Sequence, residues 1–307
     1  MAVDWMRLLL AAFVVLAHSG LGRETVGLAD LSAGNSILRV AVPTFTLIAG
    51  YFLESTLQRG RMSRWAGSLL TLYAAWSALY ILFLWPYYAA RPVSVTAREL
   101  VLGFMHLWFL LGLAMSGMML AVARHFGVVA VVASALIFAG TGFYLQHARM
   151  GAGVDLDLEM YRNGPFYLYP YLVMGWLIAR TPPARLPAMP ILGLMLAAGL
   201  ALSMWETGFW LERRGEDPLL EMPVGHLLMC PALFLLVMRL PMPPSRLPLG
   251  RAAAGIYVMH VIFLQGLPMI GIDDLALRAA AGFLLPLAIV VGAVAVGPRL
   301  PILGRLF

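Results

Sequence analysis

Residues 3–21 of the chain read VDWMRLLLAAFVVLAHSGL, an almost wholly apolar stretch that carries Asp4, Arg7 and His18. A stretch of about 20 apolar residues is long enough to cross a bilayer as an α-helix. Ionisable side chains inside such a segment are costly to bury, so they mark a candidate functional site. At roughly 100° per residue, Asp4 and Arg7 share one face, and the step to His18 returns within about 20° of Arg7. We therefore expect one stripe that carries all three groups, with His18 roughly 16 Å deeper than Arg7.

A simpler interpretation of the same stretch is a signal-anchor helix that is merely flanked by charges. Arg7 would then reach the membrane surface along its own aliphatic stem, and His18 would bond to a neighbouring helix. The spacing alone leaves this alternative open.

The composition of the whole chain is that of a polytopic membrane protein. Of its 307 residues, 62% are hydrophobic and only 12% are charged, whereas about 25% are charged in soluble domains. The mean hydropathy is +0.86. All 21 basic residues are arginine, and the net charge of +6 does not indicate a nucleic-acid partner. The single cysteine, Cys230, excludes an internal disulfide and a cysteine-based metal cluster, and we expect no metal.

Hydropathy predicts a single all-α domain over residues 1–307, built as a bundle of about ten transmembrane helices. The expected ranges are 3–21, 37–57, 66–88, 101–123, 128–145, 166–179, 189–210, 223–238, 253–270 and 277–297. The sixth range is short, and we expect Pro170 to interrupt it beside a cavity, where freed backbone groups find partners.

Charged residues predict how this bundle is oriented. The even-numbered connections and the C-terminus carry arginines and no acidic residue, whereas the odd-numbered connections hold nearly all the acidic residues. The positive-inside rule then places both termini in the cytoplasm. An even number of spans leads to the same conclusion.

Two further histidines fall inside predicted spans. His106 lies early in the fourth span and His260 near the middle of the ninth, so both reach about the depth of His18. A neutral imidazole in the membrane can act as a general base for a hydroxyl group. Each residue also has a simpler interpretation: His106 as an interfacial anchor beside Trp108, and His260 as a hydrogen bonder between packed helices.

The predicted cytoplasmic end carries a second set of charges. Arg61 and Arg64 stand at the start of the third span, and Glu54 lies just before them near the end of the second. An arginine pair suits an anionic, phosphorylated ligand, because guanidinium groups bind phosphate through paired hydrogen bonds. Arginines at this face can equally be topology signals alone, and Glu54 can simply pair with one of them.

Five short patterns follow one another along the chain. They are Arg7 with His18 eleven positions later and Asp4 before them, VPTFTLIAGYF at 42–52, RMSR at 61–64, HLWFL at 106–110 and YVMH at 257–260. In this order they resemble the motifs of the membrane-bound acyltransferase-3 family, ten-helix bacterial O-acyltransferases that modify glycans. The family commonly has Ser-Gly where this chain has Ala49-Gly50. The family's frequent soluble SGNH-type domain is missing, so the resemblance is to stand-alone members that acetylate surface polysaccharides.

The resemblance implies an enzyme of the bacterial inner membrane. It implies an acyl-CoA donor, most often acetyl-CoA, that enters from the cytoplasm, and a hydroxyl of a polysaccharide or lipid-linked sugar as acceptor. In this interpretation Arg61 and Arg64, with Glu54 beside them, engage the phosphates of the donor. Whether the acyl group travels along a tunnel to the outer face, or the acceptor dips into the bundle, stays open, as does the oligomeric state.

The catalytic roles follow from the same resemblance. His18 activates the acceptor hydroxyl or carries the acyl group itself, while Asp4 and Arg7 support the first helix and the donor. His106 and His260 are second-rank catalytic candidates. The rival function is a proton-coupled transporter or flippase of lipid-linked sugars that uses the histidines as a proton relay. A non-catalytic membrane scaffold would have no need for aligned buried charges.

Overall fold

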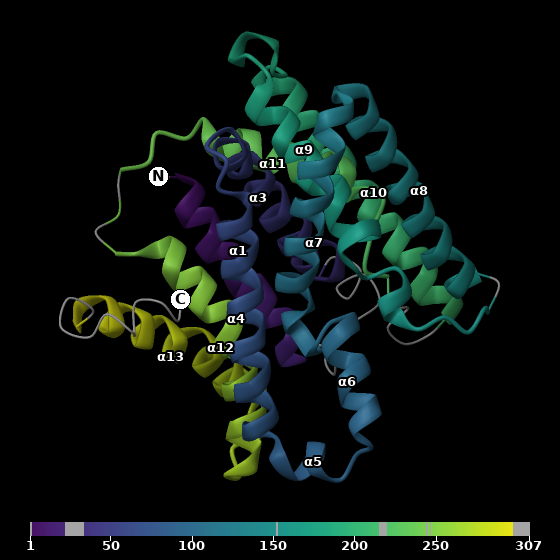
Figure 1. Cartoon of the computed structure of the whole chain (residues 1–307). Coiled ribbons are helices and arrows are strands. Elements are labelled where there is room, and N and C mark those ends of the chain that lie inside the picture. The colour runs from purple at the N-terminus through teal and green to yellow at the C-terminus, as the bar shows by residue number, and fades with distance from the viewer. Residues whose placement is uncertain are drawn as a thin grey trace.

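The computed structural model describes residues 2–21, 34–151, 153–214, 220–243, 245 and 247–296. Within these ranges every regular element is a helix, as Figure 1 shows. Among the described residues, eight helices are long and apolar enough to cross a membrane. The prediction of an all-α membrane protein is therefore confirmed for this part of the chain, while the cytoplasmic location of the termini stays a prediction.

The helices follow the predicted ranges closely. The first part of the chain forms α1 (Ala2–Ser19), α3 (Ala41–Gln58), α4 (Met62–Phe83), α5 (Trp85–Ala89) and α6 (Val93–Leu102). The rest forms α7 (Trp108–Ala123), α8 (Val128–Gly151), α9 (Tyr169–Arg180), α10 (Met189–Arg214), α11 (His226–Met238), α12 (Leu249–Met269) and α13 (Leu275–Val296). Each predicted range overlaps one of these helices. Because α9 and α11 are short, the count of ten crossings stays a prediction.

Helices from distant parts of the sequence form the centre of the bundle. α1 packs against α12 and α3, and α3 packs in turn against α9 and α11. α8 and α10 lie together on one side of the molecule, with α13 on the opposite side (Figure 1). The N-terminus and the start of α12 lie at one end of the bundle, and α5 and α6 lie at the other (Figure 1). We call these the predicted cytoplasmic end and the predicted outer end.

The predicted fourth span, 101–123, is wrong as a continuous helix. α6 ends just before Gly103, and a short 3-10 helix, Met105–Leu107, leads into α7. Gly103 has a φ of 133°, and a Cβ atom there would lie only 2.5 Å from the Cβ of Trp108. Only glycine fits this turn without strain. The break is hidden in the sequence because apolar residues run through it without a change of hydropathy.

Pro170 does not interrupt the sixth span. A π-helix, Gly164–Leu168, precedes α9, and Pro170 lies in the first turn of α9. The π-helix continues directly into α9, and the residues before Pro170 already have helical φ and ψ. The expectation of a proline-broken span is thus wrong: the chain stays helical through Pro170 and changes only from π to α geometry.

The contact between α3 and α9 is a direct backbone approach. A Cβ atom on Gly175 would lie 1.9 Å from the carbonyl oxygen of Leu47. A Cβ atom on Gly50 would lie 2.0 Å from the carbonyl oxygen of Leu172. Glycines at such positions let membrane helices approach closely. The short helix α9 is therefore held at the centre of the bundle by its fit to α3.

We expect Gly175→Ala to destabilise the protein by more than an ordinary overpacking change, which costs about 1–3 kcal/mol. The added methyl group meets backbone atoms of α3, which have no rotamer by which to move away. The matched control is Gly193→Ala in α10, where a Cβ atom meets nothing within 4 Å. Thermal unfolding of the purified variants in detergent measures both. Equal melting temperatures for the two variants would contradict the α3–α9 contact.

Candidate active site

The structure brings His18, His106 and His260 together, and we call these three residues the histidine cluster. Their ring centroids are 4.8 Å apart for His106 and His260, 5.1 Å for His18 and His260, and 6.5 Å for His18 and His106. The three come from the end of α1, the 3-10 turn before α7 and the middle of α12. The predicted convergence at one depth is confirmed, and it requires the packing of α1 on α12.

Backbone carbonyl groups determine which ring nitrogen of two histidines carries a proton. Nδ1 of His18 lies 2.8 Å from the carbonyl oxygen of Val14, and Nδ1 of His260 lies 2.8 Å from that of Tyr257. A carbonyl oxygen only accepts, so each Nδ1 donates its N–H group. In the neutral ring, Nε2 is then left with a free lone pair. Both histidines thus offer Nε2 as a base.

The histidine cluster contains buried polar atoms without partners. Nε2 of His260 and both ring nitrogens of His106 have no hydrogen-bond partner among the described residues. Leaving a buried donor or acceptor unpaired costs about 1–3 kcal/mol. Natural proteins leave few such atoms, and each needs an explanation such as a catalytic role or a bound group. Here three such atoms lie on two rings whose centroids are 4.8 Å apart, which marks this place as a candidate site for chemistry.

Access differs sharply within the histidine cluster. His106 and His260 are buried, with 6% and 0% of their surface exposed, whereas His18 is exposed. His18 is therefore the member of the histidine cluster with the most accessible surface. The two buried rings lie behind it, in contact with it and with each other.

Tyrosines hold the buried part of the cluster in place. The hydroxyl of Tyr257 donates to the backbone carbonyl of His106. The hydroxyl of Tyr80 on α4 donates to the carbonyl of Val258 at 2.8 Å, and Val258 precedes His260 by two residues on α12. The residue before His106, Met105, has a φ of 45°, which costs free energy for any residue other than glycine. The position of His106 is thus fixed by a strained turn and a tyrosine bond, neither of which the sequence pattern indicates.

Asp4 and Arg7 form an ion pair at the predicted cytoplasmic end. Nη1 of Arg7 lies 3.1 Å from Oδ1 of Asp4, as the spacing of three residues predicts. The Arg7 guanidinium also lies 5.0 Å from the ring centroid of Phe52 on α3. Beside this pair is a cavity of about 310 Å³, whose lining includes Asp4 and, from the start of α12, Gly250 and Arg251. Arg251 is a basic group at this end that the motif analysis did not select.

Arg61 and Arg64 are exposed at the start of α4. They do not line the cavity beside Asp4. Within the described ranges neither guanidinium group forms an ion pair, so both can meet a ligand at the surface, but they do not contact the histidine cluster.

Glu54 pairs with Arg180, so the simpler interpretation, a pair with Arg61 or Arg64, does not hold. Its carboxylate accepts from Arg180 Nη1 at 2.9 Å, from Trp176 Nε1 at 2.6 Å and from Gln58 Nε2 at 2.9 Å. Three donors occupy its two oxygen atoms. Glu54 therefore ties α3 to α9, and its suggested part in donor binding stays untested.

A second group of charges lies near the histidine cluster at the predicted outer end, and the motif analysis missed it. We call Arg39, Arg162 and Glu221 the outer charge cluster. Nη1 of Arg39 lies 2.7 Å from Oε1 of Glu221, with side chains 17% and 16% exposed. The Arg162 guanidinium lies 5.4 Å from the ring centroid of Trp108. The available signal was Arg39, a charged residue inside the predicted span 37–57.

The charges around Glu221 are coupled across this space. Burial of Glu221 alone would raise the pKa of its carboxyl group, but the positive charges of Arg39 and Arg162 lower it. The resulting pKa lies below the ordinary value. The two arginines therefore keep the Glu221 side chain in its charged form, although the three residues are distant in sequence.

The described part of the chain contains no set of ligands for a metal ion. No group of three or more His, Cys, Asp or Glu side chains is placed there to hold a metal ion.

Comparison with known families gives one match. A family model described as an acyltransferase domain, Acyl_transf_3, matches residues 2–297, nearly the whole chain. Comparison with curated proteins finds no match, and comparison with solved structures finds none.

Proposed function

Since this chain belongs to the membrane-bound acyltransferase-3 family and is thus a membrane acyltransferase, we propose that it transfers an acyl group from acyl-CoA to a sugar hydroxyl. The acyl group is acetyl, and the acceptor is a polysaccharide or a lipid-linked sugar at the bacterial inner membrane. The observation that carries the proposal is the histidine cluster, in which the exposed His18 offers a free Nε2 in front of two buried histidines.

The reaction proceeds in two steps at His18. Nε2 takes the proton of the acceptor hydroxyl while the hydroxyl oxygen attacks the thioester carbonyl carbon. This attack forms the new C–O bond and a tetrahedral oxyanion. The oxyanion then collapses, the C–S bond breaks, and the CoA thiolate takes the proton back from His18. The products are an ester and free CoA. The N–H group of His106, which has no partner among the described residues, is suited to donate to the oxyanion.

The donor approaches from the predicted cytoplasmic end. Basic groups gather there on three elements, as Arg7 on α1, Arg61 and Arg64 on α4, and Arg251 on α12. Arginine is well suited to the phosphates of CoA. From Arg7 to His18 the rise along α1 is about 16 Å, so an extended donor arm is needed to bring the thioester to the histidine cluster.

His260 has a narrower role than His18. We expect His260→Gln to lower the turnover rate by about tenfold at most, because one hydrogen bond contributes about 0.5–1.5 kcal/mol. The reason is that His260 is fully buried behind His18 and bonds through Nδ1 to its own helix. Steady-state rates with saturating acetyl-CoA measure the effect. A loss of a hundredfold or more would make His260 a proton-transfer group in its own right, and unchanged turnover would make it a packing residue.

The proposed function is tested by mixing the purified protein in proteoliposomes with acetyl-CoA and a mixture of bacterial surface glycans. We expect release of free CoA thiol that requires the glycans and is accompanied by O-acetyl groups in them. Release of CoA without acetylated glycan would indicate a thioesterase. If neither product forms while the protein moves lipid-linked sugars across the bilayer, the transporter interpretation is favoured.

A further inference from the structure

The outer charge cluster carries one more positive than negative charge. Arg39 and Glu221 neutralise each other, but Arg162 forms no ion pair within the described part of the chain. Its Nε atom is buried there without a hydrogen-bond partner, and its guanidinium lies over Trp108. Keeping such a cation partly out of water is costly unless a counter-charge is bound. The planar set of N–H donors of arginine matches the oxygens of a carboxylate or a phosphate.

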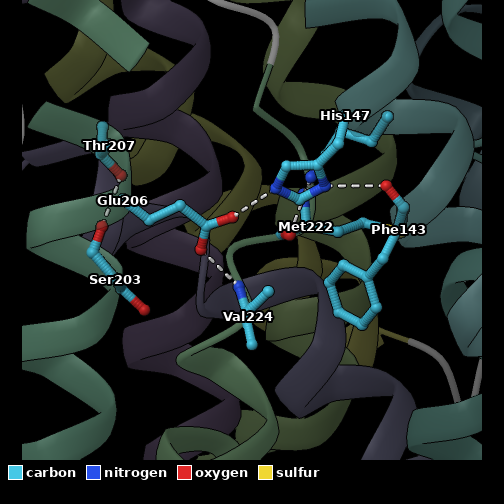
Figure 2. Close-up of polar contacts among 8 residues, drawn as sticks. Phe143, His147, Ser203, Glu206, Thr207, Met222 and Val224 are labelled. Atoms are coloured by element: carbon cyan, nitrogen blue, oxygen red, sulfur yellow. Dashed lines mark hydrogen bonds and ion pairs between the residues drawn. The ribbon is translucent and has the colours of Figure 1, made fainter. Parts of the chain in front are cut away.

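Buried polar side chains hold the segment that carries Glu221. Oε1 and Nε2 of the fully buried Gln146 bond to the backbone N–H and C=O groups of Met222, at 2.8 and 2.9 Å. Glu206, 4% exposed, accepts from the backbone N–H of Val224 at 2.6 Å, and its other oxygen lies 3.2 Å from Nε2 of His147 (Figure 2). Side chains on α8 and α10 thus fix the backbone just after Glu221.

The segment that carries Arg39 is held in a similar way. Nε2 of the buried His226 donates to the backbone carbonyl of Ser36 at 2.8 Å. The hydroxyl groups of Ser36 and Thr207 lie 3.1 Å apart. Polar networks of this kind are costly to bury and rigidify the groups that they satisfy. The backbone segments that carry Arg39 and Glu221 are therefore held in place by buried hydrogen bonds in addition to apolar packing.

The outer charge cluster lies next to the catalytic base. Trp108, which carries the Arg162 guanidinium on its ring, follows His106 by two residues and stacks on Tyr167 with centroids 6.0 Å apart. The rings of His106 and His18 have centroids 6.5 Å apart. The exposed His18 and the unneutralised Arg162 are thus linked through His106 and Trp108 at the same end of the bundle.

We propose that the outer charge cluster is an acceptor subsite, where Arg162 binds an oxyanion of the acceptor beside the hydroxyl that His18 deprotonates. This inference rests on the proposed acyl transfer and adds the substrate class: the acceptor is anionic. The oxyanion is the carboxylate of an acidic sugar or the phosphate that joins a sugar to its lipid carrier. Arg39 and Glu221 border the subsite and hold its shape.

Binding of three small probes to the full-length protein in detergent tests the inference. The probes are methyl glucuronide, the matched neutral methyl glucoside, and a short-chain prenyl diphosphate-linked N-acetylglucosamine. Saturation-transfer NMR detects such weak ligands. We expect at least one anionic probe to bind about tenfold or more tightly than the glucoside. This is the difference in affinity that one charge-assisted hydrogen bond provides. The glucuronide and the prenyl diphosphate separate the two sources of the oxyanion. Equal binding of all three probes, or none, overturns the subsite.

The variant Arg162→Gln should lose the preference for the anionic probe. The matched control is Arg98→Gln, which removes an arginine whose side chain is 62% exposed at the same end and pairs with Asp157; it should bind like the wild type. Acetyl-CoA binding by each sample, measured by calorimetry, separates the two levels of the account. If the wild type does not bind acetyl-CoA, the proposed function is contradicted. If acetyl-CoA binds but Arg162→Gln keeps the preference for the anionic probe, only the subsite is overturned.

Glu221→Gln gives a second test with the opposite sign, which holds even if Arg162→Gln fails to fold. It raises the net charge of the outer charge cluster from about +1 to about +2, so the anionic probe should bind as tightly as before or severalfold more tightly. A subsite for neutral sugars would instead lose a hydrogen-bond acceptor and bind the glucoside less well. Weaker binding of the anionic probe, with acetyl-CoA binding intact, contradicts the inference.

Discussion

His18→Ala is expected to abolish acyl transfer, with a loss of roughly 10²–10⁴-fold, the usual effect of removing a positioned general base. A sugar hydroxyl is far too weak an acid to attack a thioester at neutral pH without help. In the structure, His18 is the exposed member of the histidine cluster, and its Nε2 has no hydrogen-bond partner among the described residues. Transfer is measured by mass spectrometry of the glycan, and acetyl-CoA binding by calorimetry on the same preparation.

Donor binding should survive in this variant, because the basic groups at the predicted cytoplasmic end lie about 16 Å along α1 from His18. The matched control is His125→Ala, an exposed histidine between α7 and α8 that belongs to no cluster; its activity should equal that of the wild type. Loss of acetyl-CoA binding in His18→Ala would make His18 a structural residue. Full transfer activity would overturn the mechanism.

The second large effect is expected at the predicted cytoplasmic end. Replacing Arg61 and Arg64 together by Gln should raise the KM for acetyl-CoA about tenfold or more per residue, because each charge-assisted contact contributes about 1.5–3 kcal/mol. The turnover rate at saturating donor should change little, since neither residue reaches the histidine cluster. Initial rates over a range of acetyl-CoA concentrations separate the two constants.

Two controls make the result decisive. Arg59→Gln removes an exposed arginine from the same turn and should leave KM unchanged. Cysteine labelling of the connections must show that the double variant keeps its orientation, because these arginines can also act as topology signals. If KM is unchanged in a correctly oriented double variant but rises in Arg251→Gln, the donor phosphates lie in the cavity beside Asp4 instead.

Helical periodicity predicted much of the candidate site. The pairing of Asp4 with Arg7 follows from a spacing of three residues on one helix. The meeting of the three histidines was predicted from depth alone, since orientation and span order place them at one level. Their roles stay predictions, because contact between rings does not show which proton moves.

What the pattern missed depends on contacts between distant segments or on the backbone. The turn at Gly103 interrupts a run with uniform hydropathy, so only its φ of 133° reveals it. Glu54 has arginines close by in sequence, yet its partner Arg180 comes from a helix that packs on α3 through glycines. The outer charge cluster unites residues from three separate segments of the chain, and periodicity within one helix carries no information about such a group.

The most direct measurement of the central claim follows radiolabelled acetyl-CoA in sealed vesicles that contain either the wild-type protein or His18→Ala. With the wild type, we expect the acetyl label to appear in glycan as an alkali-labile ester, and with His18→Ala we expect intact donor binding and no labelled glycan. Label in the glycan of both samples would contradict a catalytic His18. Movement of lipid-linked sugar without any labelled ester in the wild type would contradict acyl transfer itself.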